Sequence, residues 1–182
     1  VLMTLDELID AFYVNEDSGK YLDAHARLFA MSRREGAKAA AWYLSTWQYT
    51  HTCHFGPESI LGQTGYDSFG GTLVSTVHEG IDPFALCYIP ELYRLCQLTG
   101  EERWRERARG IWQNGCQHIS DGTLVIDGKL RPKGSQDESY TVTRQGAKRG
   151  TCSGWLVAWP GAFRMEVLRR LGEERDFLEA DS

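Results

Sequence analysis

The stretch ELYRLCQLTGEERWRERARGIWQNG, residues 91–115, decides the fold of this 182-residue chain. Its first half carries an apolar face at three- and four-residue spacing and ends at Leu98-Thr99-Gly100, a glycine stop signal for a helix. Glu101 and Glu102 follow at once, and a second apolar face then recurs at Trp104, Ala108, Ile111 and Trp112. Two helices joined by so short a turn predict an antiparallel α/α-hairpin.

Further helices are predicted on both sides of this hairpin. Asp82-Pro83 is a strong helix start, because Asp is a preferred N-cap and Pro fits the first helical position, while Pro90 predicts a kink or a restart. Gly36 either separates two helices or kinks a single one, and Pro160 delays the last helix, which ends at Gly172. Helical spacing or capping signals recur over residues 5–13, 21–33, 37–47 and 154–171, and EERDFLEA forms a short final helix or a tail.

Two long segments between the helices lack this periodicity. Residues 50–81 are rich in glycine and small hydroxyl residues, which predicts a loop with at most brief strands. A loop of that length inside a domain usually serves a function. DGTLVIDGKL, residues 121–130, alternates apolar and polar side chains and carries two Asp-Gly turn signals, so it predicts one small β-hairpin.

Composition narrows the class of protein. The length and the 42% apolar content suit one domain, residues 1–182, and 20 basic against 25 acidic residues argue against a nucleic-acid partner. No apolar run approaches the roughly 18 residues that span a bilayer, so no membrane partner is expected. Five cysteines without CxxC spacing predict neither a disulfide framework nor a structural zinc site, which favours a cytoplasmic location.

Residues 91–115 resemble the helix-turn-helix unit of the six-hairpin glycosidase superfamily, whose (α/α)6 toroids reuse a corner of Leu-Thr-Gly, an acidic residue and an aromatic residue. The similarity extends over about residues 66–171. It implies an all-α fold in which antiparallel α/α-hairpins form part of a toroid, with long loops and one small β-hairpin. The chain shows about seven helical segments, which is fewer than six hairpins require, so the resemblance implies a toroid-like fragment of a larger enzyme or a curved half-ring.

In that superfamily the loops on one rim of the ring supply the functional groups, and its members include hydrolases, lyases and epimerases. The resemblance therefore implies a carbohydrate-active protein with a carbohydrate substrate, a glycoside hydrolase being the leading hypothesis. A polysaccharide lyase and a non-catalytic helical scaffold that binds glycan are the alternatives. Neither a cofactor nor a metal is expected, and further partners are other domains of the parent chain or a second copy of this one.

The candidate catalytic carboxylates lie in two segments, VHEGID (residues 77–82) and GSQDESY (residues 134–140). Glycoside hydrolysis uses one protonated and one ionised carboxyl group. Neighbouring side chains in an extended segment point opposite ways, so two adjacent carboxylates rarely share both jobs. We therefore predict one from each segment, which must then meet at a shared mouth: Asp137 or Glu138 as the acid, with Glu79 or Asp82 as the base beside His78.

Each of these residues also has a purely structural interpretation. Asp82 is explained by N-capping, and Asp137 and Glu138 either solvate a turn or pair with a cation at Arg131, Lys133 or Arg144. In the lyase alternative, Tyr140 or His78 would abstract the proton beside a uronate carboxylate, which Arg144 would neutralise.

Substrate binding is predicted at Gln136, Tyr140, Arg144 and Trp155, since aromatic faces suit the apolar face of a sugar ring. His51-Thr-Cys-His54 offers two imidazoles and a thiol, but it lacks the supporting ligands of a zinc site. No nucleophile elbow, Walker loop or dinucleotide fingerprint is present, which disfavours serine hydrolases, P-loop enzymes and Rossmann enzymes.

Overall fold

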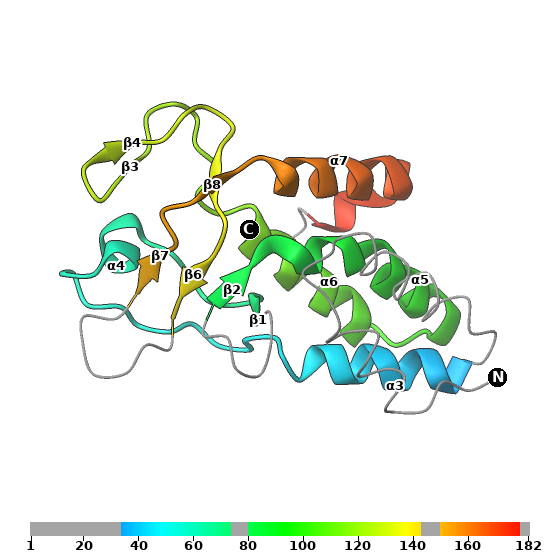
Figure 1. Cartoon of the computed structure of the whole chain (residues 1–182). Helices are drawn as coiled ribbons and strands as arrows, with labels where there is room; N and C mark the ends of the chain where they lie inside the picture. Colours follow the sequence, from blue (N-terminus) through cyan, green and yellow to red (C-terminus); the bar gives the residue numbers. More distant parts are fainter. Residues whose placement is uncertain (1–33, 74–79, 143–149, 179–182) are drawn as a thin grey trace.

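The structure is a computed structural model, and it describes residues 34–73, 80–142 and 150–178. Helices α3, α5, α6 and α7 lie toward one end of the molecule, and short antiparallel sheets with the short helix α4 lie toward the other, as Figure 1 shows. The helices are α3 (Arg34–Ser45), α4 (Ile60–Thr64), α5 (Ile89–Thr99), α6 (Arg103–Gly115) and α7 (Trp159–Leu171), with the 3₁₀ helices η1 (Pro83–Tyr88) and η2 (Gly172–Leu178). The predicted helices at 5–13 and 21–33 lie outside the described residues.

The predicted α/α-hairpin is confirmed by α5 and α6, which pack antiparallel around a Gly100 turn. Gly100 adopts the left-handed conformation, with φ 71°, and its N–H donates to the Cys96 carbonyl oxygen (2.7 Å). Trp104, Ala108 and Ile111 are buried in a core shared with η1, α3, α7 and η2. The hairpin therefore forms the centre of the helical end, as its sequence predicts.

Helix starts follow the local sequence signals in two further places. The N–H of Phe84 donates to Asp82 Oδ1 (2.8 Å), so Asp82 caps η1 as predicted. The chain then restarts as α5 at Ile89, with Pro90 in its first turn, which confirms the predicted break. Gly36 lies inside α3, whose described part begins two residues before it.

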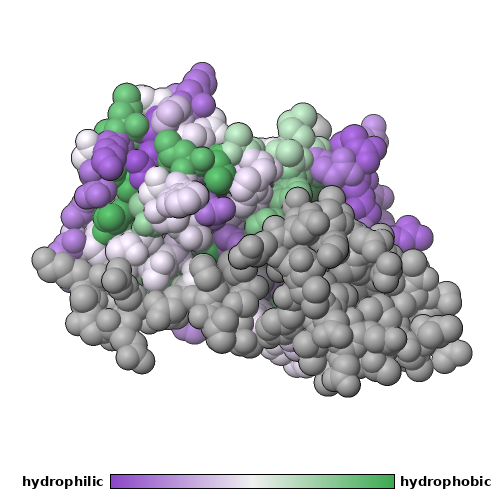
Figure 2. Space-filling view, in the orientation of Figure 1, coloured by the Kyte–Doolittle hydropathy of each residue, from purple (hydrophilic) through white to green (hydrophobic). Residues whose placement is uncertain are grey.

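The sheets are built from strands of two or three residues. A four-stranded sheet has the order β1 (Thr72–Leu73), β2 (Gly80–Asp82), β6 (Tyr140–Thr141) and β7 (Thr151–Cys152), and β5 (Gln136–Asp137) pairs with β8 (Leu156–Val157). The predicted β-hairpin is confirmed by β3 (Val125–Ile126) and β4 (Lys129–Leu130). Its turn residues Asp127 and Gly128 both have positive φ, 52° and 68°, as a type I′ turn requires. Exposed apolar side chains on one face of the molecule appear green in Figure 2.

The expected all-α toroid is wrong, because the described residues form a mixed helix-and-sheet structure with five α-helices and three antiparallel sheets. The segments that the sequence assigns to loops contain most of the strands, and residues 60–64 form α4. Residues 156–157, assigned to the last helix, form β8, and α7 begins only at Trp159, next to Pro160. Strands of two residues are too short for alternation to be visible in the sequence.

Candidate active site

Pairing of β2 with β6 brings the two acidic segments together. Gly80 is opposite Thr141 and Ile81 is opposite Tyr140 in this antiparallel ladder. The described part of the first segment, residues 80–82, thus lies beside the end of GSQDESY, and a sheet joins the two and not helices around an axis. His78, Glu79 and Arg144 lie outside the described residues, which leaves Asp82 and Glu138 as the carboxylates to consider first.

Asp82 ends β2 and its carboxyl group is buried, with 8% of the residue exposed. Burial raises its pKa from 3.8 to about 7, and the negative charge of Glu138 acts in the same direction. The Phe84 N–H that donates to Asp82 Oδ1 opposes this rise but does not cancel it. Asp82 therefore keeps a proton close to neutral pH, which an ordinary capping aspartate does not.

Glu138 and Trp155 lie together at the edge of the β5–β8 pair. The Glu138 N–H donates to the Trp155 carbonyl oxygen (2.9 Å), and a further strand contact joins Ser153 N–H to the Ser139 carbonyl oxygen (2.9 Å). Glu138 is half-buried, whereas 74% of the Trp155 residue is exposed. At this edge, the exposed indole of Trp155 belongs to a residue whose backbone is hydrogen-bonded to that of the half-buried Glu138.

Asp137 points into the core, with 1% of the residue exposed. Its two oxygens accept from Arg131 Nε (3.1 Å) and Nη2 (3.2 Å), and Oδ1 also accepts from the Gly154 N–H (3.0 Å). Arg131 is itself 5% exposed, so the pair is buried from both sides. Of the alternatives that the sequence offers for Asp137, the structure shows the ion pair with Arg131.

Gln136 is also a core residue, and its amide group is already occupied. Its Nε2 donates to the carbonyl oxygens of Gly115 (3.1 Å) and Gln117 (2.6 Å), while its Oε1 accepts from Arg164 Nη1 (2.9 Å). Arg164 also donates to Gly115 O (2.9 Å), so this network ties α7 to the end of α6. No part of Gln136 faces a rim where a substrate would bind.

Tyr140 is buried as well, stacked on Tyr66 with ring centroids 4.5 Å apart. Burial raises its pKa, which removes the phenolate that the lyase alternative would need as a base. Its hydroxyl oxygen has no hydrogen-bond partner among the described residues, and the Tyr66 hydroxyl donates to Asn114 Oδ1 (3.2 Å). Tyr140 thus belongs to a second hydrophobic core, separate from that of the helices, together with Leu61, Tyr66, Ile81 and Val142.

His118 is a residue of this region that the sequence does not single out. Its ring lies against Tyr140 (centroids 5.2 Å apart) and Tyr66 (5.3 Å), and its backbone has a positive φ of 56°. Burial lowers its pKa, against the opposing effects of the Thr64 backbone and the Asp137 charge. A single histidine in the run QHIS carries no sequence signal for such a position, because only packing creates it.

Within the described part of the chain, no group of three or more His, Cys, Asp or Glu side chains is arranged to hold a metal ion. None of the helices described is both long and apolar enough to cross a membrane. Comparison with family models, with curated proteins and with solved structures finds no match to this chain.

The raised pKa of Asp82 predicts how stability changes with pH. Between pH 3.8 and about 7 the folded protein holds a proton that the unfolded chain has lost, so the free energy of unfolding falls as the pH rises through this window. Asn at this position caps the helix but cannot ionise. We expect Asp82→Asn to match the wild type near pH 4 and to be more stable at pH 8, by roughly 2–4 kcal/mol.

Urea unfolding at several pH values between about 4 and 8 measures this difference. Asp121→Asn is the matched control, because hydrogen bonds from Thr123 lower the pKa of that exposed carboxyl group. Its stability change should have the opposite sign at pH 8. Equal pH dependence of the Asp82→Asn variant and the wild type would contradict the buried proton.

Proposed function

We propose that this chain is a carbohydrate-active domain that hydrolyses glycosidic bonds, with Asp82 as the proton donor and Glu138 as its carboxylate partner. The observation that carries the proposal is the buried Asp82 carboxyl group at the end of β2, which holds its proton to about pH 7 and whose strand pairs with Tyr140, two residues after Glu138. Pairs of carboxyl groups with pKa values pushed apart by their surroundings are the usual acid and base of glycoside hydrolysis.

The two side chains supply complementary steps. Asp82 gives its proton to the glycosidic oxygen as the bond to the anomeric carbon breaks, so the leaving sugar departs as a neutral alcohol. Glu138 either removes a proton from the water that attacks the anomeric carbon or attacks that carbon itself. This assignment reverses the sequence-based hypothesis, which took the acid from GSQDESY, because burial acts on Asp82 and leaves Glu138 half-exposed.

Trp155 supports a sugar as the substrate class. An indole that is 74% exposed costs solvation free energy unless it covers an apolar surface, and the C–H face of a pyranose is such a surface. Its carbonyl oxygen accepts from the Glu138 N–H (2.9 Å), so a sugar stacked on this ring would lie close to the proposed catalytic carboxylate. A lyase has less support, since the raised pKa of Tyr140 leaves no phenolate to act as its base.

The experiment that tests the proposal is a hydrolysis screen of aryl glycosides and oligosaccharides by the full chain. Reducing-sugar release is the expected result, with kcat/KM falling as the pH rises through about 7 and Asp82 loses its proton. Absorbance of an unsaturated sugar product would assign a lyase instead. Sugar binding measured by calorimetry without any turnover would assign a non-catalytic scaffold, and either outcome overturns the proposal.

Loss of the exposed indole should weaken substrate binding more than it slows the chemical step. We expect Trp155→Ala to raise KM about tenfold with a smaller change in kcat, since one ring contact is worth about 1 kcal/mol or slightly more. Trp155→Phe keeps an aromatic face and should retain most of the affinity. Met165→Ala, which removes an equally exposed apolar side chain from α7, is the matched control and should leave KM unchanged. Equal KM values for all three variants would remove Trp155 from the binding surface.

A further inference from the structure

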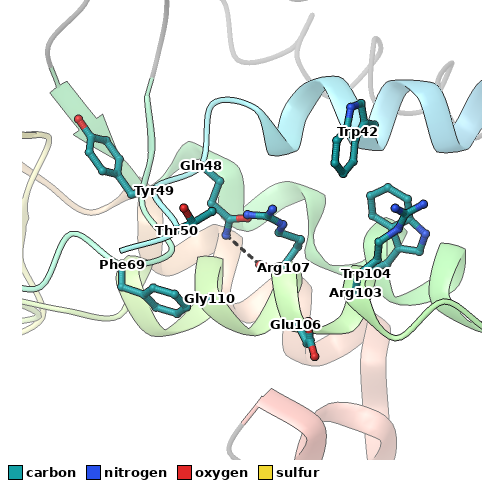
Figure 3. A pocket seen from close by; sticks show the side chains of 10 residues that line it. All are labelled: Trp42, Gln48, Tyr49, Thr50, Phe69, Arg103, Trp104, Glu106, Arg107 and Gly110. Atoms are coloured by element: carbon teal, nitrogen blue, oxygen red, sulfur yellow. Dashed lines mark hydrogen bonds between the residues drawn. The ribbon is translucent and has the colours of Figure 1, made fainter. Parts of the chain in front are cut away.

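A cavity of about 240 Å³ lies between α3, α6 and the segment that follows α3 (Figure 3). Arg103, Arg107 and Gly110 form its α6 side, at positions i, i+4 and i+7 of one helix face. Trp42 of α3 stands near one end and Phe69 near the other, and both rings are largely open, with 54% and 42% of these residues exposed. None of the residues that line this cavity belongs to the candidate active site.

A stack of planar groups fixes the end of the cavity near α3. The Arg103 guanidinium lies 5.4 Å from the ring centroid of Trp42 and 4.5 Å from that of Trp104. Glu101 pairs with Arg103, and Lys38 Nζ holds the same carboxylate at 2.7 Å. Arg103 is therefore held in place by Glu101, which it shares with Lys38, and its guanidinium lies against both indoles.

The end near Phe69 is fixed by close backbone packing. A Cβ atom added to Gly70 would lie 2.0 Å from the Gly110 carbonyl oxygen, so only glycine allows this approach of the Phe69–Gly70 segment to α6. Gln48 locks the contact, because its Nε2 donates to the carbonyl oxygens of Gly70 (3.1 Å) and Arg107 (3.0 Å). The backbone at Phe69 and Gly70 is thus held against α6 at this end of the cavity.

Arg107 lies between these two ends and has no carboxylate partner among the described residues. Within the described residues, the Arg107 side chain makes one hydrogen bond, which is long and runs from Nη1 to Gln48 Oε1 (3.4 Å). Glu106 is its neighbour in sequence, but that side chain points away from Arg107, as Figure 3 shows. The planar guanidinium fork is consequently available to an anion, and carboxylates fit it through two parallel hydrogen bonds.

We propose that this cavity binds a uronic-acid unit of an acidic oligosaccharide, with its carboxylate on Arg107 and sugar rings stacked on Trp42 and Phe69. The volume is below the roughly 300–1000 Å³ of pockets for drug-sized ligands, which suits one or two rings. The polar side chain of Thr50 lies between the two aromatic residues, and a hydroxyl-bearing sugar suits it better than an aromatic acid does. The inference concerns binding alone and does not require hydrolysis at Asp82 and Glu138.

Isothermal titration of the full chain with digalacturonate tests this site, with the methyl ester of the same disaccharide as the uncharged probe. We expect binding of digalacturonate that is at least about tenfold tighter than binding of the ester. Arg107→Met should reduce the affinity for digalacturonate to that for the ester, and Arg107→Lys should fall between, because it keeps the charge but loses the fork. Trp42→Ala should weaken both probes by about tenfold.

Asp121→Asn, which removes an exposed carboxylate outside the cavity, is the matched control, and Glu138→Gln separates this site from the proposed catalytic one. Both variants should bind digalacturonate as the wild type does, whether or not the protein hydrolyses any sugar. Equal binding of acid and ester by the wild type overturns the proposal without any variant. Absence of binding, or binding of benzoate in preference to digalacturonate, overturns it as well.

Discussion

Asp137→Ala is expected to lower the free energy of unfolding by about 3–5 kcal/mol, enough to unfold much of the protein at ambient temperature. The substitution leaves the Arg131 guanidinium, 5% exposed, without its counter-charge, and it removes the acceptor of the Gly154 N–H. Desolvation of an unpaired buried cation accounts for most of the cost. Urea unfolding followed by circular dichroism measures the change.

Two further variants separate this mechanism from a loss of packing alone. Replacing both partners, as in Arg131→Met with Asp137→Leu, removes both buried charges and should recover most of the stability that Asp137→Ala loses. Glu138→Gln, one residue along the chain, is half-exposed and should change the stability by less than about 0.5 kcal/mol. A cost below about 1 kcal/mol for Asp137→Ala would show that the Arg131 pair does not support the fold.

The parts of the fold that the sequence predicts correctly are those whose signals lie within a few residues of each other. Gly100 ends α5, Asp82 caps η1 and the Asp127-Gly128 turn closes a hairpin, and each of these depends on local backbone geometry. The four-stranded sheet depends on Ile81 meeting Tyr140 across a long stretch of chain, through strands only two or three residues long. No periodicity in the sequence reveals such a pairing, and the resemblance to α/α-toroids implies an all-α fold in its place.

Prediction of the site shows the same division between local and tertiary information. Alternation along an extended segment correctly implies that Asp137 and Glu138 point in different directions. It does not say which of them faces the core, since that depends on Arg131 and Gly154, which approach through tertiary packing. The proton on Asp82 is likewise hidden from the sequence, because the N-cap alone would lower the pKa and burial by the rest of the fold raises it.

Substitution of either proposed catalytic carboxyl group is expected to lower kcat for glycoside hydrolysis by about 10²–10⁴-fold, the usual contribution of a general acid or base. Asp82→Asn removes the donated proton but keeps the helix cap, and Glu138→Gln keeps the shape of the carboxylate but not its charge. Steady-state kinetics on the best substrate of the screen, for both variants and for Asp121→Asn as an exposed control, measure the effect. Full turnover in both carboxyl variants would remove these residues from the mechanism.

The pH dependence of the same variants distinguishes catalysis from stability. In the wild type, kcat/KM should fall as the pH rises through about 7, because the free enzyme loses the Asp82 proton. Glu138→Gln removes the nearby negative charge, so it should lower the pKa of Asp82 and move this fall in its residual activity to a lower pH. Asp82→Asn should lose the fall altogether while gaining stability at pH 8. If Asp82→Asn is more stable and less active than the wild type, the buried carboxyl group of Asp82 lowers stability but is needed for catalysis. A residue that only caps a helix would not show this combination.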